Sequence, residues 1–537
     1  MTSASNFQIL CREIESETLS SNFGEVFDNA VRAYATKPAW IPVDSPSSAL
    51  TYADLADLVA KSASAFAHMG VRKGSHVGLI MPTAPEHLAA WVALAKLGAV
   101  SIGINPSYTP NELKYTLTDG KADYVLVASD FLDNLKSSGV IGSTVDSKNV
   151  VVWEENLESS ETWNKLLEFA KDIPEFASIA LEDPINILYT SGSTGFPKGC
   201  VLPHSYWVVK GKVMAKLWPD VTRIQSDAPF HYMGPLWRFA FACYLGAAVC
   251  VSPRASLTRF MKRWQDNNID FGWVNNAMSM TTPGETDGKN NLKVLGASNI
   301  NPRLHRAAEA RFNAVIREHY GMTEIGLAIV MPKEAVEMVG SGSCGVVAPF
   351  RDCMIADESG NPVATGEIGE LYVSGMGIVK EYIGRPEANR DAFTGKWFKT
   401  GDLFRQDENG FYYFHSRIKD IIRRSSENIS ATEVEAALAT IAEIEEVAVG
   451  PVADPMRGEE VKAFIILKED ESPDTVTPAS IIAHCSHLLA RYKLPRYFQF
   501  FSEFPRTSSN KIAKKLLLDG QGTSVTGTFD VTSGKWS

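Results

Sequence analysis

Residues 189–199, which read YTSGSTGFPKG, constrain this chain most. They contain three glycines, four Ser or Thr hydroxyls and Lys198, and the apolar run 185–189 before them is typical of a buried strand. Glycine tolerates positive φ, so several backbone N–H groups can point the same way and, with the hydroxyls and the ammonium group, hold phosphate oxygens. The segment is not a Walker A loop, because no Gly-Lys-Ser/Thr ending follows. We predict a phosphate-binding loop rather than a flexible surface loop.

Length and composition predict a globular protein with more than one domain. The 537 residues exceed what one core holds, and 45% hydrophobic and 21% charged residues are ordinary for a soluble chain. The net charge of −11 disfavours nucleic acid or an anionic membrane as a partner. The seven cysteines include no CxxC pair, which favours neither disulfides nor zinc and fits a cytoplasmic location. We expect no signal peptide and no membrane span.

The pattern along the chain predicts an α/β fold. Strand and helix patterns alternate at about residues 20–150 and 180–340, which indicates two doubly wound sheets, and Thr51 is a candidate N-cap of one helix. Short strands with Gly and Pro turns at about residues 345–415 are typical of a small β-barrel or another β-rich lobe. We therefore expect a large N-terminal domain over 1–418, a small α+β C-terminal domain over 419–519, and a disordered tail over 520–537.

The loop resembles the phosphate-binding signature of the adenylate-forming superfamily, which includes acyl-CoA synthetases, peptide-synthetase adenylation domains and luciferases. Further motifs that match the superfamily in the right order are residues 228–234, 320–324, 397–402, 415–422 and 505–511. The ordered set is more specific than any one motif. The small domain most resembles bacterial crotonobetaine/carnitine-CoA ligases, with a fainter resemblance to acyl-CoA ligases of secondary metabolism, of the platensimycin-pathway type.

The resemblance implies a site for ATP and AMP. The residues that it assigns to this site are Thr190, Ser191, Gly192, Ser193, Thr194, Gly195, Lys198, Ala297, Ser298, Tyr320, Gly321, Met322, Thr323, Asp402 and Arg417. The catalytic residues would be Lys198, Thr323, Glu324 and Lys511. Of these, Glu324 can hold Mg²⁺ against the triphosphate, and Lys511 matches the lysine that is brought to the substrate carboxylate.

The resemblance also implies sites for the acid and for CoA. The expected acyl pocket consists of His231, Trp237, Trp273, Asn275, Asn276, Gly296 and Met322. Lys419 matches the hinge about which the small domain swings, and Ser425, Ser426 and Glu427 follow in the channel for CoA. Residues 230–237 contain no Asp, the residue with which peptide synthetases hold an amino group, so an α-amino acid is disfavoured.

The expected reaction has two steps. A carboxylate attacks the α-phosphate of ATP to give an acyl-adenylate and pyrophosphate, and the CoA thiol then displaces AMP. Two departures from the motifs bear on these steps: Ser426 stands where relatives have glycine in the CoA channel, and Asn510 stands where they have glycine before Lys511.

Three readings stay open at this point. The chain is an acyl-CoA ligase, or a partial enzyme that performs one half-reaction alone (serving an acyl-carrier protein, or using a supplied adenylate), or a non-catalytic acyl- or nucleotide-binding protein. The sequence also leaves open a homodimer, the identity of the acid and the pathway.

Overall fold

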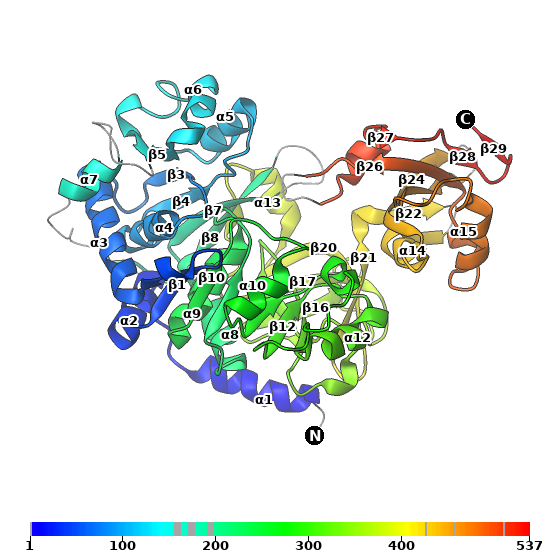
Figure 1. Ribbon diagram of the computed structural model, residues 1–537, viewed down its shortest axis with the longest axis horizontal. Helices are drawn as coiled ribbons and strands as arrows, with labels where there is room; N and C mark the ends of the chain where they lie inside the picture. The colour runs from blue at the N-terminus through cyan, green and yellow to red at the C-terminus, as the bar shows by residue number, and fades with distance from the viewer. Residues whose placement is uncertain are drawn as a thin grey trace. The chain divides into compact units, whose positions relative to one another are not determined.

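The computed structural model describes residues 3–154, 163–169, 178–190, 197–424, 427–454, 457–507 and 511–537 (Figure 1). Its contacts divide the chain into two units. The first consists of Met1–Cys353, Val373–Phe398 and Asn409–Phe411, and the second of Met354–Tyr372, Lys399–Glu408 and Tyr412–Ser537. The division passes inside the segment 345–415, and the domain boundary after residue 418 stays a prediction.

One sheet of the first unit has the strand order β18-β8-β7-β4-β3-β5-β6. Its strands are β3 (His76–Ile80), β4 (Val100–Gly103), β5 (Tyr124–Ala128), β6 (Val150–Trp153), β7 (Pro184–Thr190), β8 (Lys198–Pro203) and β18 (Glu381–Tyr382). Strands β3 to β7 run parallel, as predicted, whereas β8 and β18 are antiparallel additions. The strand predicted over 185–189 is β7, which pairs antiparallel with β8.

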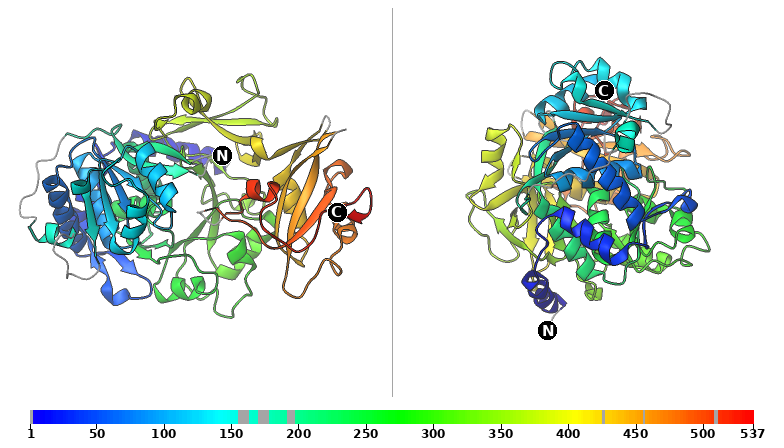
Figure 2. Two further views of the ribbon diagram at one scale, coloured as in Figure 1. Left: turned by 90° about the horizontal axis from the view of Figure 1, so that it is seen from above. Right: turned by 90° about the vertical axis from the view of Figure 1, so that its left-hand side faces the viewer.

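Helices cover both faces of this sheet (Figures 1 and 2). They are α3 (Tyr52–His68), α4 (Pro85–Leu97), α5 (Pro110–Asp119), α6 (Leu132–Ser137) and α7 (Trp163–Phe169). Thr51 caps α3 as predicted: its side chain accepts from the Asp54 N–H, and the Asp54 carboxylate accepts from Thr51 in return. Helix α4 is buried almost all round, because it lies between the sheet and α3.

The second sheet of this unit has the order β15-β14-β13-β12-β11-β9-β10-β1-β2. Its strands are β1 (Pro38–Pro42), β2 (Leu50–Thr51), β9 (Arg223–Ser226), β10 (Ala248–Val251), β11 (Phe271–Trp273), β12 (Val294–Ala297), β13 (Val315–Met322), β14 (Gly326–Val330) and β15 (Val346–Val347). The helices around it are α1 (Ser3–Ser16), α2 (Phe23–Tyr34), α8 (His204–Leu217), α9 (Met233–Leu245), α10 (Phe260–Asp266), α11 (Asn276–Met280) and α12 (Pro302–Phe312). Helices α8 and α9 pack against each other, and α9 also contacts β9 and β10.

The β-rich segment forms a sheet with the order β16-β17-β20-β19, and β21 pairs with β20. Its elements are β16 (Arg351–Ala356), β17 (Gly369–Gly375), α13 (Pro386–Ala392), β19 (Phe393–Thr394), β20 (Trp397–Gln406) and β21 (Tyr412–Arg417). Within the described residues the pairing runs from β16 to β19 without closing, so of the two predicted forms the structure shows a β-rich lobe with an open sheet and not a barrel. The edge strand β19 has only two residues, too few to close a ring.

The C-terminal part of the second unit is an α+β sandwich, as expected. Its sheet has the order β23-β22-β25-β26-β28-β29, with β24 beside β25 and β27 beside β26. The elements are β22 (Ile421–Arg424), β23 (Glu427–Ser430), α14 (Ala431–Leu438), β24 (Ile444–Asp454), β25 (Gly458–Leu467), α15 (Pro478–Cys485), β26 (Tyr497–Glu503), α16 (Lys514–Leu518), β27 (Thr523–Ser524), β28 (Phe529–Asp530) and β29 (Lys535–Trp536).

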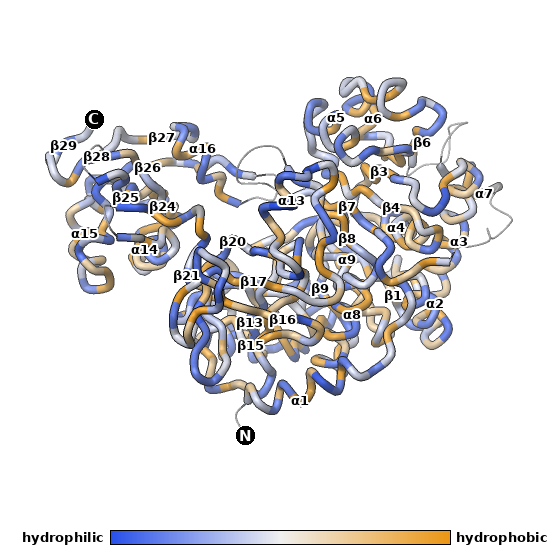
Figure 3. The backbone as a smooth tube through the Cα atoms, turned by 180° about the vertical axis from the view of Figure 1, so that it is seen from behind, coloured by the Kyte–Doolittle hydropathy of each residue, from blue (hydrophilic) through white to orange (hydrophobic). Residues whose placement is uncertain are grey.

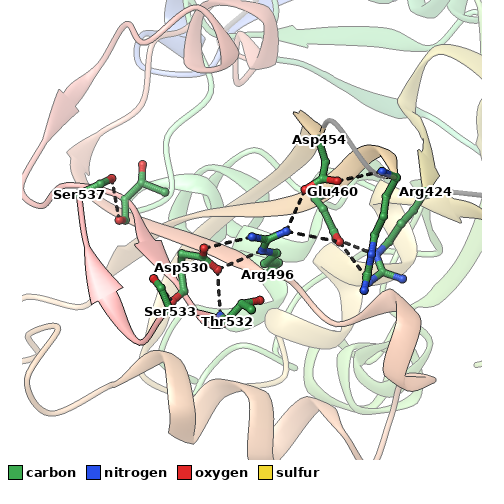
Figure 4. A network of polar contacts seen from close by, with 10 residues as sticks. Arg424, Asp454, Glu460, Arg496, Asp530, Thr532, Ser533 and Ser537 are labelled. Atoms are coloured by element: carbon green, nitrogen blue, oxygen red, sulfur yellow. Dashed lines mark hydrogen bonds and ion pairs between the residues drawn. The ribbon is translucent and has the colours of Figure 1, made fainter.

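The tail after residue 520, expected to be disordered, forms β27 to β29 instead. The Trp536 ring packs at a tilt of 57° against Phe529, with ring centres 5.1 Å apart, and its centre lies 6.1 Å from that of the Phe500 ring. Arg496 joins the tail to the sheet, because it pairs with Asp530 at 3.0 Å and with Asp454 at 2.9 Å (Figure 4). These long-range contacts order a segment whose composition alone favours disorder.

Apolar residues concentrate along sheet strands such as β7 and β8 (Figure 3). Among the described residues no helix is long and apolar enough to cross a lipid bilayer.

Candidate active site

A cavity of about 230 Å³ lies in the first unit, between α8, α9 and the ends of β11 to β14. Its lining residues are Lys210, Met214, Met233, Gly234, Trp237, Arg238, Trp273, Ser298, His319, Tyr320, Gly321, Gly326 and Leu327. Trp237 and Trp273 were predicted for the acyl pocket, and Ser298, Tyr320 and Gly321 for the nucleotide. The structure therefore brings residues of both predicted sites to one cavity, although they lie far apart in the sequence.

The nucleotide side of the cavity is formed by strand ends. Ala297 is buried at the end of β12, and the Ser298 hydroxyl next to it donates to the His319 carbonyl at 2.9 Å. The register of the β13–β14 hairpin shifts between Tyr320 and Gly321. A Cβ at Gly321 would lie 2.0 Å from the Gly326 carbonyl oxygen, so only glycine fits there. The ladder continues past the shift, with Gly321 opposite Leu327 and Met322 opposite Gly326.

The other residues predicted for the acyl pocket do not line the cavity. Asn275 caps α11 by accepting from Met278, and the Asn276 side chain bonds the backbone of residues 299 and 301. A glycine is required at position 296, because a Cβ there would lie 2.5 Å from the Trp273 ring. Met322 and Thr323 are half-buried after the hairpin shift. Their roles toward the acid and the nucleotide stay predictions.

His231 is buried beside the neighbouring ring of Tyr232, with centroids 4.3 Å apart. Burial, and then His87, lower the pKa of His231 to about 3. Both of its ring nitrogens lack a hydrogen-bond partner among the described residues. It is a neutral imidazole outside the cavity lining, and its assignment to the acyl pocket stays a prediction.

Glu324 and Lys198 meet around Tyr382, a residue that the sequence reading missed. The Tyr382 hydroxyl donates to Oε1 of Glu324 at 3.0 Å, and Lys198 Nζ lies 4.8 Å from the centre of the Tyr382 ring. Burial, and then the Glu324 charge, raise the pKa of Tyr382. Strand β18 carries Tyr382 and pairs with β8, which carries Lys198. No local sequence pattern predicts a pairing between two strands that lie so far apart along the chain.

Thr190 pairs with Lys198 across the β7–β8 hairpin. The predicted phosphate-binding residues Ser191, Gly192, Ser193, Thr194 and Gly195 lie outside the described residues.

Tyr382→Phe is expected to lower kcat/KM for acid activation about 10-fold, because Glu324 loses a hydrogen bond in a buried site. Tyr413→Phe is the matched control, since it removes a hydroxyl that donates to another carboxylate, Asp407, at 3.0 Å. Acid-dependent pyrophosphate exchange measures both variants. Equal activity of the Tyr382 variant and the wild type would show that this bond does not position Glu324.

The remaining predicted residues lie in the second unit. Asp402 and Arg417 face each other across β20 and β21, with Nε 3.3 Å from Oδ1, and the Asp402 side chain is only 6% exposed. Lys419 lies in the short turn Ile418–Asp420, and Glu427 begins β23. Ser425 and Ser426 lie outside the described residues.

Lys511 is exposed in a loop closed by two bonds to Thr507. The Thr507 N–H donates to the Lys511 carbonyl at 2.8 Å, and the Lys511 N–H donates to the Thr507 hydroxyl at 3.1 Å.

Comparison with known proteins agrees with this arrangement. The AMP-binding enzyme family matches residues 27–383, and the AMP-binding enzyme C-terminal domain matches residues 433–511. Crotonobetaine/carnitine–CoA ligase of Salmonella paratyphi A is 26% identical over 521 residues, covering 92% of this chain and 98% of that protein. The ligase of that name from Citrobacter koseri is 27% identical over 523 residues, with the same coverage.

Solved structures share the fold. The anthranilate CoA ligase AuaEII in complex with anthranoyl-AMP superposes with a TM-score of 0.83 at 24% identity, covering 94% of this chain and 98% of that one. The o-succinylbenzoate CoA synthetase of Bacillus subtilis, in complex with its acyl-adenylate intermediate, gives 0.81 at 22% identity and covers 94% and 100%. Fold and cavity together define an α/β protein of the adenylate-forming type. The chain belongs to the AMP-binding enzyme family.

Proposed function

We propose that this chain is an AMP-forming acid–CoA ligase that activates a carboxylic acid as an acyl-adenylate and passes the acyl group to CoA. The observation that carries the proposal is the shared cavity, in which apolar Trp237 and Trp273 lie with Ser298 and Tyr320 of the nucleotide motifs. A cavity with a mainly apolar lining and a few polar groups suits a small organic acid. The seven cysteines are free, in keeping with a reducing cytoplasm as the place of action.

The first step must bring two anions together, so positive charge has to be concentrated around the α-phosphate. Lys198 and Lys511 supply it, and Thr323 donates to the phosphate. Asp402 is buried and acceptor-only, which suits the ribose hydroxyls beside Arg417. In this reaction the protein mainly positions and stabilises charge.

Glu324 is a buried carboxylate that fits Mg²⁺. Among the described residues no cluster of three metal-ligating side chains exists, and Mg²⁺ in nucleotide sites is held by one or two carboxylates together with phosphate oxygens. When bound, Mg²⁺ neutralises charge on the departing pyrophosphate. Tyr382 fixes the carboxylate by its hydrogen bond to Oε1.

In the second step the small domain turns about Lys419, Lys511 withdraws, and residues 425–427 border the CoA channel. The thiol attacks the acyl-adenylate carbonyl and AMP leaves. Ser426 and Asn510 leave open the narrower alternative in which one half-reaction is lost, with a carrier-protein thiol in place of CoA or with a supplied adenylate as substrate.

Acid-dependent ATP–pyrophosphate exchange over aliphatic, aryl and polycyclic acids, with mass spectrometry of CoA thioesters in the same samples, tests the proposal. Exchange together with thioester is the expected result. Exchange without thioester would point to Ser426 and an adenylating enzyme, whereas thioester from synthetic acyl-adenylate alone would point to Asn510. Neither product with any acid or adenylate would refute the proposal.

A further inference from the structure

Two buried cations line the cavity. Lys210 on α8 is 8% exposed and Arg238 on α9 is 6% exposed, and both helices pack against each other (Figure 1). Lys210 Nζ lies 4.8 Å from the ring centre of Trp237, and Arg238 Cζ lies 4.9 Å from the same ring and 5.6 Å from Trp273. Both cations therefore lie against the same indole ring, that of Trp237, at the cavity wall that α8 and α9 form.

Neither cation has an anionic partner among the described residues. No ion pair or hydrogen bond joins Lys210 or Arg238 to another described group, and Nε of Arg238 is buried without an acceptor. Asp227 acts on the Arg238 charge only from a longer distance.

Other buried cations of this unit are satisfied. Lys212, two residues further along α8, donates to the carbonyls of Glu17 and Thr18 at 3.1 and 3.0 Å. Arg351 donates to the Ile325 and Phe350 carbonyls at 3.1 and 3.0 Å. The lack of partners is therefore particular to the two cations that line the cavity.

Burial of two like charges without a counter-ion is costly. Burial first, and then Arg238 and Arg351, lower the pKa of Lys210 to about 7. Burial, and then Lys210, lower the pKa of His319 to about 4, so this lining residue is a neutral imidazole and gives the two cations no counter-charge. The helix wall is electropositive, and an anion that entered the cavity would relieve this repulsion.

We propose that the acid substrate is a dicarboxylate whose second carboxylate binds between Lys210 and Arg238. This rests on the proposed function, in which the first carboxylate reacts near Ser298 and Tyr320 at the strand ends. The rings of Trp237 and Trp273 contact the carbon skeleton between the two carboxylates. A guanidinium and an ammonium group on adjacent helices can hold one carboxylate with charge-assisted hydrogen bonds.

Matched pairs of acids test this on the full-length protein. The pairs are succinate and butyrate, glutarate and pentanoate, adipate and hexanoate, and phthalate and benzoate. Binding is followed by the fluorescence of the cavity tryptophans, which needs no turnover, and activation by pyrophosphate exchange. We expect at least one dicarboxylate to bind about 10-fold tighter than its monoacid.

The variants are Lys210→Met and Arg238→Met, with Lys216→Met as control on the same helix, where Lys216 is exposed and pairs with Glu17. In the first two the ratio of dicarboxylate to monoacid affinity should fall about 10-fold, to near 1, and in the control it should not change. Thermal unfolding checks the fold of each variant, and loss of a buried unpaired charge should raise Tm rather than lower it.

Three outcomes decide the matter. Wild-type protein that binds no dicarboxylate better than its monoacid overturns the inference. An equal loss for both acids of a pair in the two variants also overturns it, because the cations would then serve the reacting carboxylate. Dicarboxylate binding that depends on Lys210 and Arg238, without pyrophosphate exchange or thioester, supports the inference and refutes the proposed ligase function instead.

Discussion

Lys511→Ala is expected to lower acid-dependent pyrophosphate exchange by about 100-fold or more while leaving thioester formation from a supplied acyl-adenylate close to wild type. The first step joins two anions, and removing one preorganised cation from such a site costs this much in kcat. In the second step the thiol attacks a neutral carbonyl, so that step does not need the lysine. Exchange with a responsive acid and thioester formation from its synthetic adenylate measure the two halves separately.

The substitution should not disturb the fold, because the Lys511 side chain is exposed and the loop is closed by backbone bonds to Thr507. Lys515→Ala is the control, since it removes another exposed lysine four positions further on. Undiminished exchange in the Lys511 variant would show that the motif match at residues 505–511 assigns the wrong lysine.

Lys210→Met is expected to stabilise the protein in a pH-dependent way. The pKa of Lys210 is about 7 against an ordinary value of 10.5, so between these values the unfolded chain carries a proton that the folded protein lacks. The stability of the wild type therefore rises with pH through this window, because the cost of the buried charge is fully present below pH 7. Methionine has no such cost.

The gain in unfolding free energy should be on the order of 3 kcal/mol at pH 6 and shrink toward pH 10. Two cations act on Lys210, Arg238 on α9 and Arg351 on β16, and burial lowers the pKa of Arg351 to about 10, so its charge begins to fall only at the upper end of this range. His319 on β13 stays neutral because its pKa is about 4. Denaturant unfolding at both pH values measures the difference.

Lys216→Met gives the comparison, because an exposed lysine should show little dependence in the same window. A Lys210 variant that is destabilised equally at both pH values would mean that the ammonium group is stabilised in the fold. That result would contradict an electropositive cavity wall at Lys210 and Arg238.

Local sequence patterns predicted the framework of the first unit. The apolar run 185–189 became β7, Thr51 became the cap of α3, and the alternating pattern became parallel sheets, because each depends on neighbours within a few residues. The ordered motifs also identified the family, since they are local segments whose residue types follow from the chemistry of phosphate and ribose.

Which distant residues share a site depends on the packing of the whole fold. Tyr382 reaches Glu324 because β18 pairs with β8, and Lys210 and Arg238 meet over Trp237 because α8 packs on α9. The tail joins the last sheet through Arg496 and Asp530, against its composition. Such pairings depend on how faces pack across long loops, which no local pattern encodes. In particular, a buried charge can be recognised as unpaired only when all of its neighbours in the fold are known.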